Sequence, residues 1–195
     1  GKGAPAALYM AVSKTLIKSR AAHDFDPSSI LTRVNSELAE NNTTSTFVTI
    51  FLAILDVSNG ELVYCNAGHN PPYIKRNSGL LEQLDELHGP ILGVLPDLTY
   101  SSDNTTLAPG DMLVMYTDGV TESMNARDEE YTDQRLADLL SESNAQMPNE
   151  LTLEILKDVR SHQGDAEQSD DITLLAAQYH GPSPEDAGHM EVRIK

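Results

Sequence analysis

The chain has 195 residues, of which 39% are hydrophobic, and this is enough for one domain with a real core. Its 30 acidic and 13 basic side chains give a formal net charge of −17, which argues against nucleic-acid binding and against direct contact with an anionic membrane. Cys65 is the single cysteine, which excludes an intramolecular disulfide. Together with the lack of a signal peptide or a long apolar stretch, this predicts a cytoplasmic segment, whose parent could be membrane-tethered through a missing N-terminal part.

Two helices are predicted near the start of the chain. The first spans residues 4–22, and the second begins after the N-cap residue Asp26 and ends near residues 41–42. Apolar side chains recur at helical spacing in both, and we expect them to form the buried faces of the helix pair. These side chains are Leu8, Val12 and Leu16 in the first helix, and Ile30, Val34 and Leu38 in the second.

Short strands are predicted to follow, in a meander. The run from residue 46 to residue 55 is rich in Phe, Val, Ile and Thr, and Asn59-Gly60 predicts a tight hairpin with two positive-φ residues before the strand at 61–64. The remaining predicted strands are 73–75, 81–84, 98–105, 111–116 and 172–177, and the remaining predicted helices are 132–143 and 149–161. This order of elements indicates an α+β layered fold.

Two acidic motifs border the last two predicted strands. Thr117-Asp118-Gly119 follows the strand at 111–116, and Ser169-Asp170-Asp171 precedes the strand at 172–177. Carboxylates at strand ends suit a hard cation such as Mg²⁺ or Mn²⁺, which prefers oxygen ligands. An Asp-Gly turn and a solvated loop end would explain the same residues. The spacing alone leaves metal binding and simple turn chemistry open.

Five motifs occur together in this chain in a specific order. They are Gly1-Lys2-Gly3-Ala4-Pro5, Asn66-Ala67-Gly68-His69-Asn70-Pro71-Pro72, Gly89-Pro90-Ile91-Leu92-Gly93-Val94, Thr117-Asp118-Gly119 and Asp170-Asp171. In this order the chain resembles the SpoIIE-like branch (stage II sporulation protein E type) of the metal-dependent PPM, or type 2C-like, serine/threonine protein phosphatases. The resemblance implies a layered α/β/β/α sandwich of two mainly antiparallel sheets flanked by helix pairs, with the first strands missing here.

The resemblance also implies a metal site. Asp118 and Asp170 match two of the family's metal ligands, while Thr117 and Asp171 are expected to orient them. The nucleophile would be a water bound to two Mn²⁺ or Mg²⁺ ions, so no catalytic side chain is expected. Two further ligand Asp residues of the family have no counterpart in this sequence. We therefore expect the fragment to bind metal weakly and to show little or no turnover.

His69 has two interpretations. It lies between a strand and the Pro71-Pro72 turn, where a histidine commonly orders a loop by hydrogen bonding. As a general acid it would have to reach the leaving oxygen of a substrate, which sequence cannot show. The loop-ordering interpretation is favoured.

The resemblance implies a protein-serine/threonine phosphatase of bacterial partner-switching signalling, with a phosphorylated anti-anti-sigma (STAS-type) protein as substrate. The alternative is a non-catalytic scaffold with the phosphatase fold that binds its partner without turnover. In the family, an upstream sensor domain acts through the first helix pair, which we expect to be a movable unit. Residues 1–180 form the predicted phosphatase domain and 181–189 a linker, while 190–195 either begin an anti-sigma-factor kinase-like domain or are a frayed tail.

Overall fold

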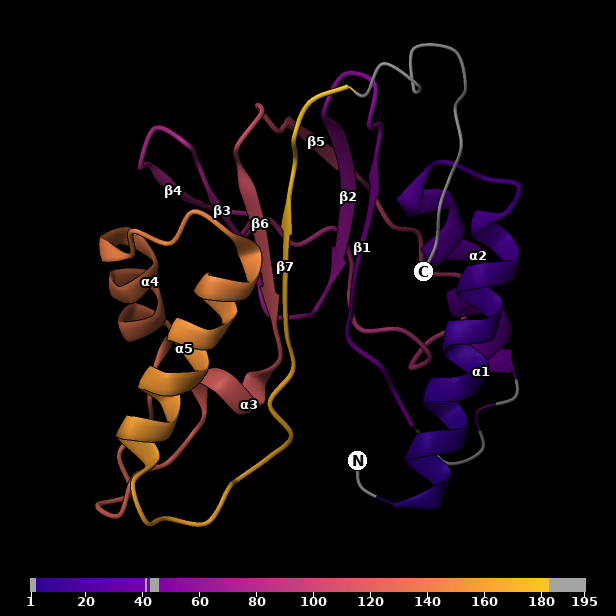
Figure 1. Ribbon diagram of the computed structural model, residues 1–195. Coiled ribbons are helices and arrows are strands. Elements are labelled where there is room, and N and C mark those ends of the chain that lie inside the picture. Colours follow the sequence, from indigo (N-terminus) through magenta and orange to yellow (C-terminus); the bar gives the residue numbers. More distant parts are fainter. Residues whose placement is uncertain (1–2, 41, 43–45, 183–195) are drawn as a thin grey trace. The chain divides into compact units, whose positions relative to one another are not determined.

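A computed structural model describes residues 3–40, 42 and 46–182 (Figure 1). The chain divides into two compact units. Among the described residues, one unit is built mainly from 3–40, 42, 46–69 and 86–106, the other from 70–85 and 107–181. Each unit combines one antiparallel sheet with a helix pair. The α+β class with two antiparallel sheets and flanking helices is therefore confirmed.

The first unit packs two helices on a three-stranded sheet. Its strands lie in the order β1-β2-β5, and β1 pairs with β2 from Ile50 opposite Ala67 to Leu55 opposite Leu62. The elements are α1 (Ala4–Ala21), α2 (Pro27–Glu40), β1 (Ile50–Leu55), β2 (Glu61–Ala67) and β5 (Asp103–Thr106).

Helix α2 carries the buried face that its sequence predicts. The Asp26 side chain accepts hydrogen bonds from the backbone N–H groups of Ser28 and Ser29, so it caps the helix directly before Pro27. Farther along, the predicted apolar face is buried and forms the centre of the core of this unit. The prediction for α2 is confirmed.

The prediction for α1 is wrong in its choice of face. Leu8 is 68% exposed and Val12 is 43% exposed, and of the three residues named only Leu16 packs against the core. The helix instead turns Tyr9, Ser13 and Ile17 inward. The sequence does not reveal this stripe because Ser13 is polar. The Ser13 side chain can nevertheless be buried, because its hydroxyl donates to the Tyr9 carbonyl at 2.8 Å. Apolar residues occur on more than one side of α1, so spacing alone selects no unique face.

The hairpin between β1 and β2 lies where it is predicted but has a different turn. Gly60 has a positive φ of 81°, whereas Asn59 does not. Asp56 organises a longer turn: its carbonyl accepts from Gly60 N at 2.8 Å and its side chain accepts from Ser58 N at 2.9 Å. The turn therefore needs only one positive-φ residue, because hydrogen bonds to Asp56 hold the rest of it in place.

The second unit contains a four-stranded sheet in the order β4-β3-β6-β7, with every neighbouring pair antiparallel. Its strands are β3 (Tyr73–Lys75), β4 (Leu81–Gln83), β6 (Met112–Tyr116) and β7 (Leu174–Gln178). Its helices are α3 (Asp118–Thr121), α4 (Asp133–Glu142) and α5 (Pro148–Gln163). The sequence predicts all of these except the short helix α3.

Helices α4 and α5 lie beside this sheet (Figure 1) and complete its core. Thr132 caps α4 by accepting from Arg135 N, and Pro148 occupies the first turn of α5. One apolar stripe of each helix is fully buried against sheet residues such as Val114. The stripes consist of Leu136 and Leu140 in α4, and Leu151, Ile155 and Val159 in α5.

Three regions predicted from the sequence lie wholly or partly outside the described residues. Residues 190–195 and most of the predicted linker at 181–189 lie outside the described residues, as do Gly1 and Lys2 of the first motif. None of the described helices combines the length and the apolar character needed to span a membrane.

Candidate functional site

Strands β6 and β7 bring the two acidic motifs to the same end of the second sheet. The strands are antiparallel, with Tyr116 opposite Leu174, so the end of β6 lies beside the start of β7. Asp118 follows β6 after one intervening residue, Thr117, and Asp170 comes shortly before β7. The buried, apolar β6 strand anchors one motif in the core, while β7 alternates partly buried and exposed residues at the sheet edge.

Thr117 joins the two motifs through three hydrogen bonds. Its backbone N–H donates to the Thr173 carbonyl at 3.1 Å, and its hydroxyl accepts from Thr173 N at 3.0 Å. The same hydroxyl donates to the Asp171 carbonyl at 3.1 Å. Thr117 therefore extends the β6–β7 pairing by one position and holds the segment after Asp170 in place.

Gly119 explains why the two segments can approach so closely. A Cβ atom at this position would lie 2.3 Å from the Asp171 carbonyl oxygen and 3.3 Å from the Asp170 carbonyl carbon. Both neighbours are backbone atoms, which cannot rotate away as a side chain can. Only glycine fits here without moving the Asp170-Asp171 segment. Sequence reasoning assigned Gly119 no such role, although a glycine inside an acidic motif after a strand was a visible signal.

Both candidate ligands are exposed at this end of the sheet. Asp118 accepts from Gly119 N at 2.9 Å, and Asp170 accepts from Asp171 N at 2.8 Å. Each carboxylate is thus oriented by the N–H of the residue that follows it. Asp171 is joined to Thr117 through its backbone carbonyl and not through its carboxylate.

The chemistry of this pair fits a hard cation. Two carboxylates on neighbouring backbone segments are the kind of donors that Mg²⁺ and Mn²⁺ take, with water completing the coordination. Among the described residues, no group of three or more His, Cys, Asp or Glu side chains gathers at a single point. Asp118 and Asp170 therefore stay candidate ligands within the part of the chain that the structure describes.

His69 belongs to the first unit, whereas the acidic motifs belong to the second. Its Nδ1 lies 3.3 Å from the Thr49 hydroxyl, and its backbone N–H donates to Asn66 Oδ1 at 2.9 Å. Asn66 also donates from Nδ2 to the His69 carbonyl at 3.0 Å, so its buried amide clamps the loop at both backbone groups of His69. These contacts fit the loop-ordering interpretation, and the clamp itself is Asn66, which the sequence did not single out.

A buried carboxylate supports the second sheet at its other end. Asp111 is 2% exposed and accepts from Arg76 Nη1 at 2.8 Å, from Asn77 N at 2.8 Å and from Ala108 N at 2.9 Å. Burial alone would raise the pKa of the Asp111 carboxyl, but these hydrogen bonds and the Arg76 charge outweigh it and hold the pKa below its ordinary value. Asp111 is read from the sequence only as part of a strand, because its partner Arg76 lies far away along the chain.

The fold of two antiparallel sheets with helix pairs is shared with solved PP2C phosphatase domains. The family model described as Stage II sporulation protein E (SpoIIE) matches residues 1–180. The chain belongs to the SpoIIE family, as the order of its motifs indicates.

Two curated relatives and one solved structure illustrate the similarity. Protein IcfG from Synechocystis sp. is 36% identical over 137 residues, and phosphoserine phosphatase RsbU from Bacillus subtilis is 35% identical over 123 residues. These matches cover 70% and 63% of this chain but only 21% of IcfG and 36% of RsbU, so the chain spans a minor part of both relatives. The structure of the RsbU and RsbW domains of Rv1364c from Mycobacterium tuberculosis matches with a TM-score of 0.79 at 27% identity, covering 94% of this chain and 51% of that one.

Proposed function

We propose that this chain is the phosphatase domain of a metal-dependent protein that hydrolyses phosphoserine or phosphothreonine in another protein. The observation that carries the proposal is the Thr117 bridge, which joins the Thr-Asp-Gly and Asp-Asp motifs at one end of the β6–β7 pair in a SpoIIE-family chain. Turn chemistry alone would require neither the bridge nor the close approach at Gly119.

Each residue of the motif pair has a separate task in this proposal. Asp118 and Asp170 would hold Mn²⁺ or Mg²⁺, Thr117 fixes the spacing of the two segments, and Gly119 permits their approach. When bound, two such ions supply charge neutralisation for the phosphoryl oxygens and activation of water. Asp171 contributes its carbonyl to the Thr117 bridge, which orients the neighbouring Asp170.

The proposed substrate is a phosphorylated anti-anti-sigma protein of the STAS type. Support comes from the relatives: RsbU is named a phosphoserine phosphatase, and Rv1364c contains RsbU and RsbW domains. A sensor domain upstream in the parent chain would control the reaction. Both statements are proposals about the whole protein, because the chain spans only part of the length of these relatives.

The decisive experiment compares single substitutions in the complete protein. Asp118→Asn and Asp170→Asn should each lower Mn²⁺-dependent hydrolysis of an aryl phosphate and of a phosphoserine-containing STAS protein by at least about 100-fold. Asp103→Asn, which removes an exposed carboxylate from β5 in the other unit, is the matched control and should leave the rate unchanged. Near-normal rates in the two motif variants would refute the assignment.

Metal binding gives a readout that does not depend on turnover. For the 195-residue chain we expect weak Mn²⁺ binding by calorimetry, weakened further by Asp118→Asn. A tight two-site isotherm would contradict the view that two ligands lie elsewhere in the parent protein. A complete protein that binds the STAS protein but hydrolyses nothing would instead support the non-catalytic scaffold. This alternative is motivated by the described residues, among which no three His, Cys, Asp or Glu side chains gather at one point.

A further inference from the structure

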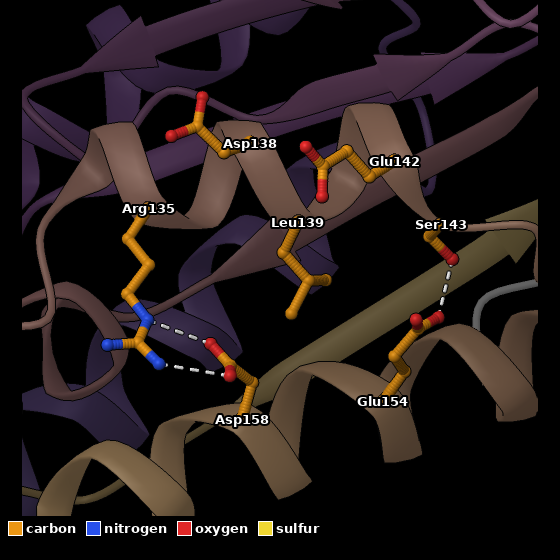
Figure 2. A pocket seen from close by; sticks show the side chains of 7 residues that line it. All are labelled: Arg135, Asp138, Leu139, Glu142, Ser143, Glu154 and Asp158. Carbon is orange, nitrogen blue, oxygen red and sulfur yellow. Dashed lines mark hydrogen bonds and ion pairs between the residues drawn. The ribbon is translucent and has the colours of Figure 1, made fainter.

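A hollow of about 420 Å³ lies between helices α4 and α5 of the second unit (Figure 2). Its volume is within the range of pockets that bind ligands, roughly 300–1,000 Å³. Leu139 points between the two helices and forms its apolar part, while Asp138 and Glu142 lie along α4 (Figure 2). We call this hollow the α4–α5 groove.

The groove is held open by a bridge at each end. Arg135 donates to both carboxylate oxygens of Asp158, from Nε at 2.9 Å and from Nη2 at 3.0 Å. At the other end, the buried Ser143 hydroxyl donates to Glu154 (Figure 2). Tyr131 reinforces the first bridge, because its hydroxyl donates to Asp158 at 2.7 Å and its ring lies under Arg135. These contacts fix the spacing of the helices, so a ligand meets a preformed surface and little ordering is needed.

The groove is strongly acidic. Four carboxylates and one guanidinium line it, which gives a formal net charge of −3. Arg135 is already committed to Asp158, and Glu154 already accepts from Ser143. Asp138 and Glu142 are exposed and one helical turn apart, so they present two negative charges on the same side of α4. Asp138 also accepts a hydrogen bond from the neutral amide of Gln134 at 2.8 Å, which leaves its charge in place.

We infer that the α4–α5 groove is a docking site for a basic amphipathic helix of a partner protein. An apolar side chain of the helix would contact Leu139, and Lys or Arg side chains one turn apart would pair with Asp138 and Glu142. Helices that lie in grooves use this combination of an apolar anchor and charged flanks. The charge excludes nucleic acid as the occupant, and the described residues form no three-ligand cluster that would suit a metal ion. This site uses none of the residues assigned to hydrolysis, so it does not depend on the proposed function.

A designed peptide tests the inference with the chain as it is. The probe is a fluorescein-labelled helical peptide of about 18 residues with Leu on one face and Lys on the other, and the control peptide carries Glu in place of Lys. The Lys peptide should bind, with an affinity that falls as salt is raised, and the Glu peptide should not. Binding should slow amide hydrogen exchange in α4 and α5 and leave α1 and α2 unchanged.

Charge-matched variants separate a groove from general attraction to an acidic protein. Asp138→Asn with Glu142→Gln should weaken the Lys peptide by roughly fivefold, because two exposed ion pairs are lost. Asp85→Asn with Glu86→Gln removes the same charge from an exposed loop and should leave the affinity unchanged. Equal weakening by both double variants, no binding of the Lys peptide, or protection outside α4 and α5 would each overturn the inference.

Discussion

The two units of this chain have similar architecture but are held together by different chemistry. In the first unit, the buried Asn35 amide joins α2 to the 93–95 loop: its Oδ1 accepts from Gly93 N and its Nδ2 donates to the Leu95 carbonyl, both at 2.9 Å. In the second unit, the equivalent long-range contact is ionic, from Arg76 to the buried Asp111. The contact between α2 and the 93–95 loop is thus made by a neutral amide, whereas the contact between Arg76 and Asp111 is a charge pair.

This difference has consequences for acid sensitivity. An amide clamp does not titrate, whereas a carboxylate clamp depends on ionisation. The second unit also ties Tyr116 to Asp133 at 2.9 Å and Tyr131 to Asp158 at 2.7 Å. Burial, and next these hydrogen bonds, raise the pKa of both tyrosines. The framework of the unit that carries the acidic motifs therefore includes several carboxylate contacts of mostly buried groups. The carboxylate contacts of the first unit, the Asp26 cap and the Arg20–Glu37 ion pair, lie nearer its surface.

The largest effect on stability is expected from the ionic clamp. Asp111→Ala leaves the mostly buried Arg76 without its main partner, and the free energy of unfolding should fall by about 3–5 kcal/mol. Glu82→Ala removes the other, more exposed partner of Arg76 and should cost about 1 kcal/mol or less. Urea denaturation measures both changes. Equal losses of unfolding free energy would mean that the buried Asp111 pair is no more stabilising than the exposed Glu82 pair.

The close approach at Gly119 gives the next largest effect. A methyl group there must displace the Asp170-Asp171 backbone, and a displacement of about 1 Å at a reacting centre can cost roughly 100-fold in rate. Gly119→Ala should therefore reduce aryl phosphate hydrolysis by the complete protein to that extent. Gly79→Ala, whose methyl group would meet nothing within 4 Å, strains a positive-φ loop of the same unit and should leave the rate unchanged. Similar rates for the two variants would contradict the proposed role of Gly119.

Loss of the neutral clamp should destabilise the first unit by a smaller amount. Asn35→Ala leaves Gly93 N and the Leu95 carbonyl without the Asn35 side chain, and this should cost about 1–3 kcal/mol. Hydrogen exchange should accelerate at residues 93–95 and in α2, while β3 and β6 keep their protection. Uniform acceleration in both units would show that they unfold together.

Acidification should weaken the stabilising contribution of Asp111 but not that of Asn35. The folded-state pKa of Asp111 is lowered, so its stabilising contribution is fully present above the unfolded pKa of about 3.9 and is lost as the pH falls through the folded value. The difference in unfolding free energy between the wild type and Asp111→Ala should shrink along this range, whereas the difference for Asn35→Ala should stay constant. A constant difference for Asp111→Ala would mean that its ionisation does not matter.

The smallest effect is expected on the outer side of α1. Leu8→Ser changes a side chain that is 68% exposed and should alter the unfolding free energy by no more than about 0.5 kcal/mol. Val34→Ala, at the fully buried centre of the α2 face, is the contrasting change and should cost about 2 kcal/mol. Comparable losses at the two positions would restore the original prediction that Leu8 faces the core.

Much of the fold follows from local pattern. The apolar stripe of α2 has one dominant side, and Asp26 with Pro27 marks its start, so both the helix and its buried face can be predicted. The strand ends near Asp118 and Asp170 can also be predicted, because an apolar run lies before the first of these residues and after the second. Family membership also follows from sequence, since five motifs in a fixed order specify more than any one of them.

Tertiary structure decided what depends on partners far away in the chain. Asn35 meets Gly93, Arg76 meets Asp111, and Thr117 meets Asp171, and none of these pairs has a local signature because the separation exceeds any helical or strand period. The buried side of α1 was decided in the same way, by the surface against which it packs. Periodicity describes which residues of an element share a side, whereas the identity of the neighbour, and hence the chemistry of the contact, is fixed only when the chain is folded.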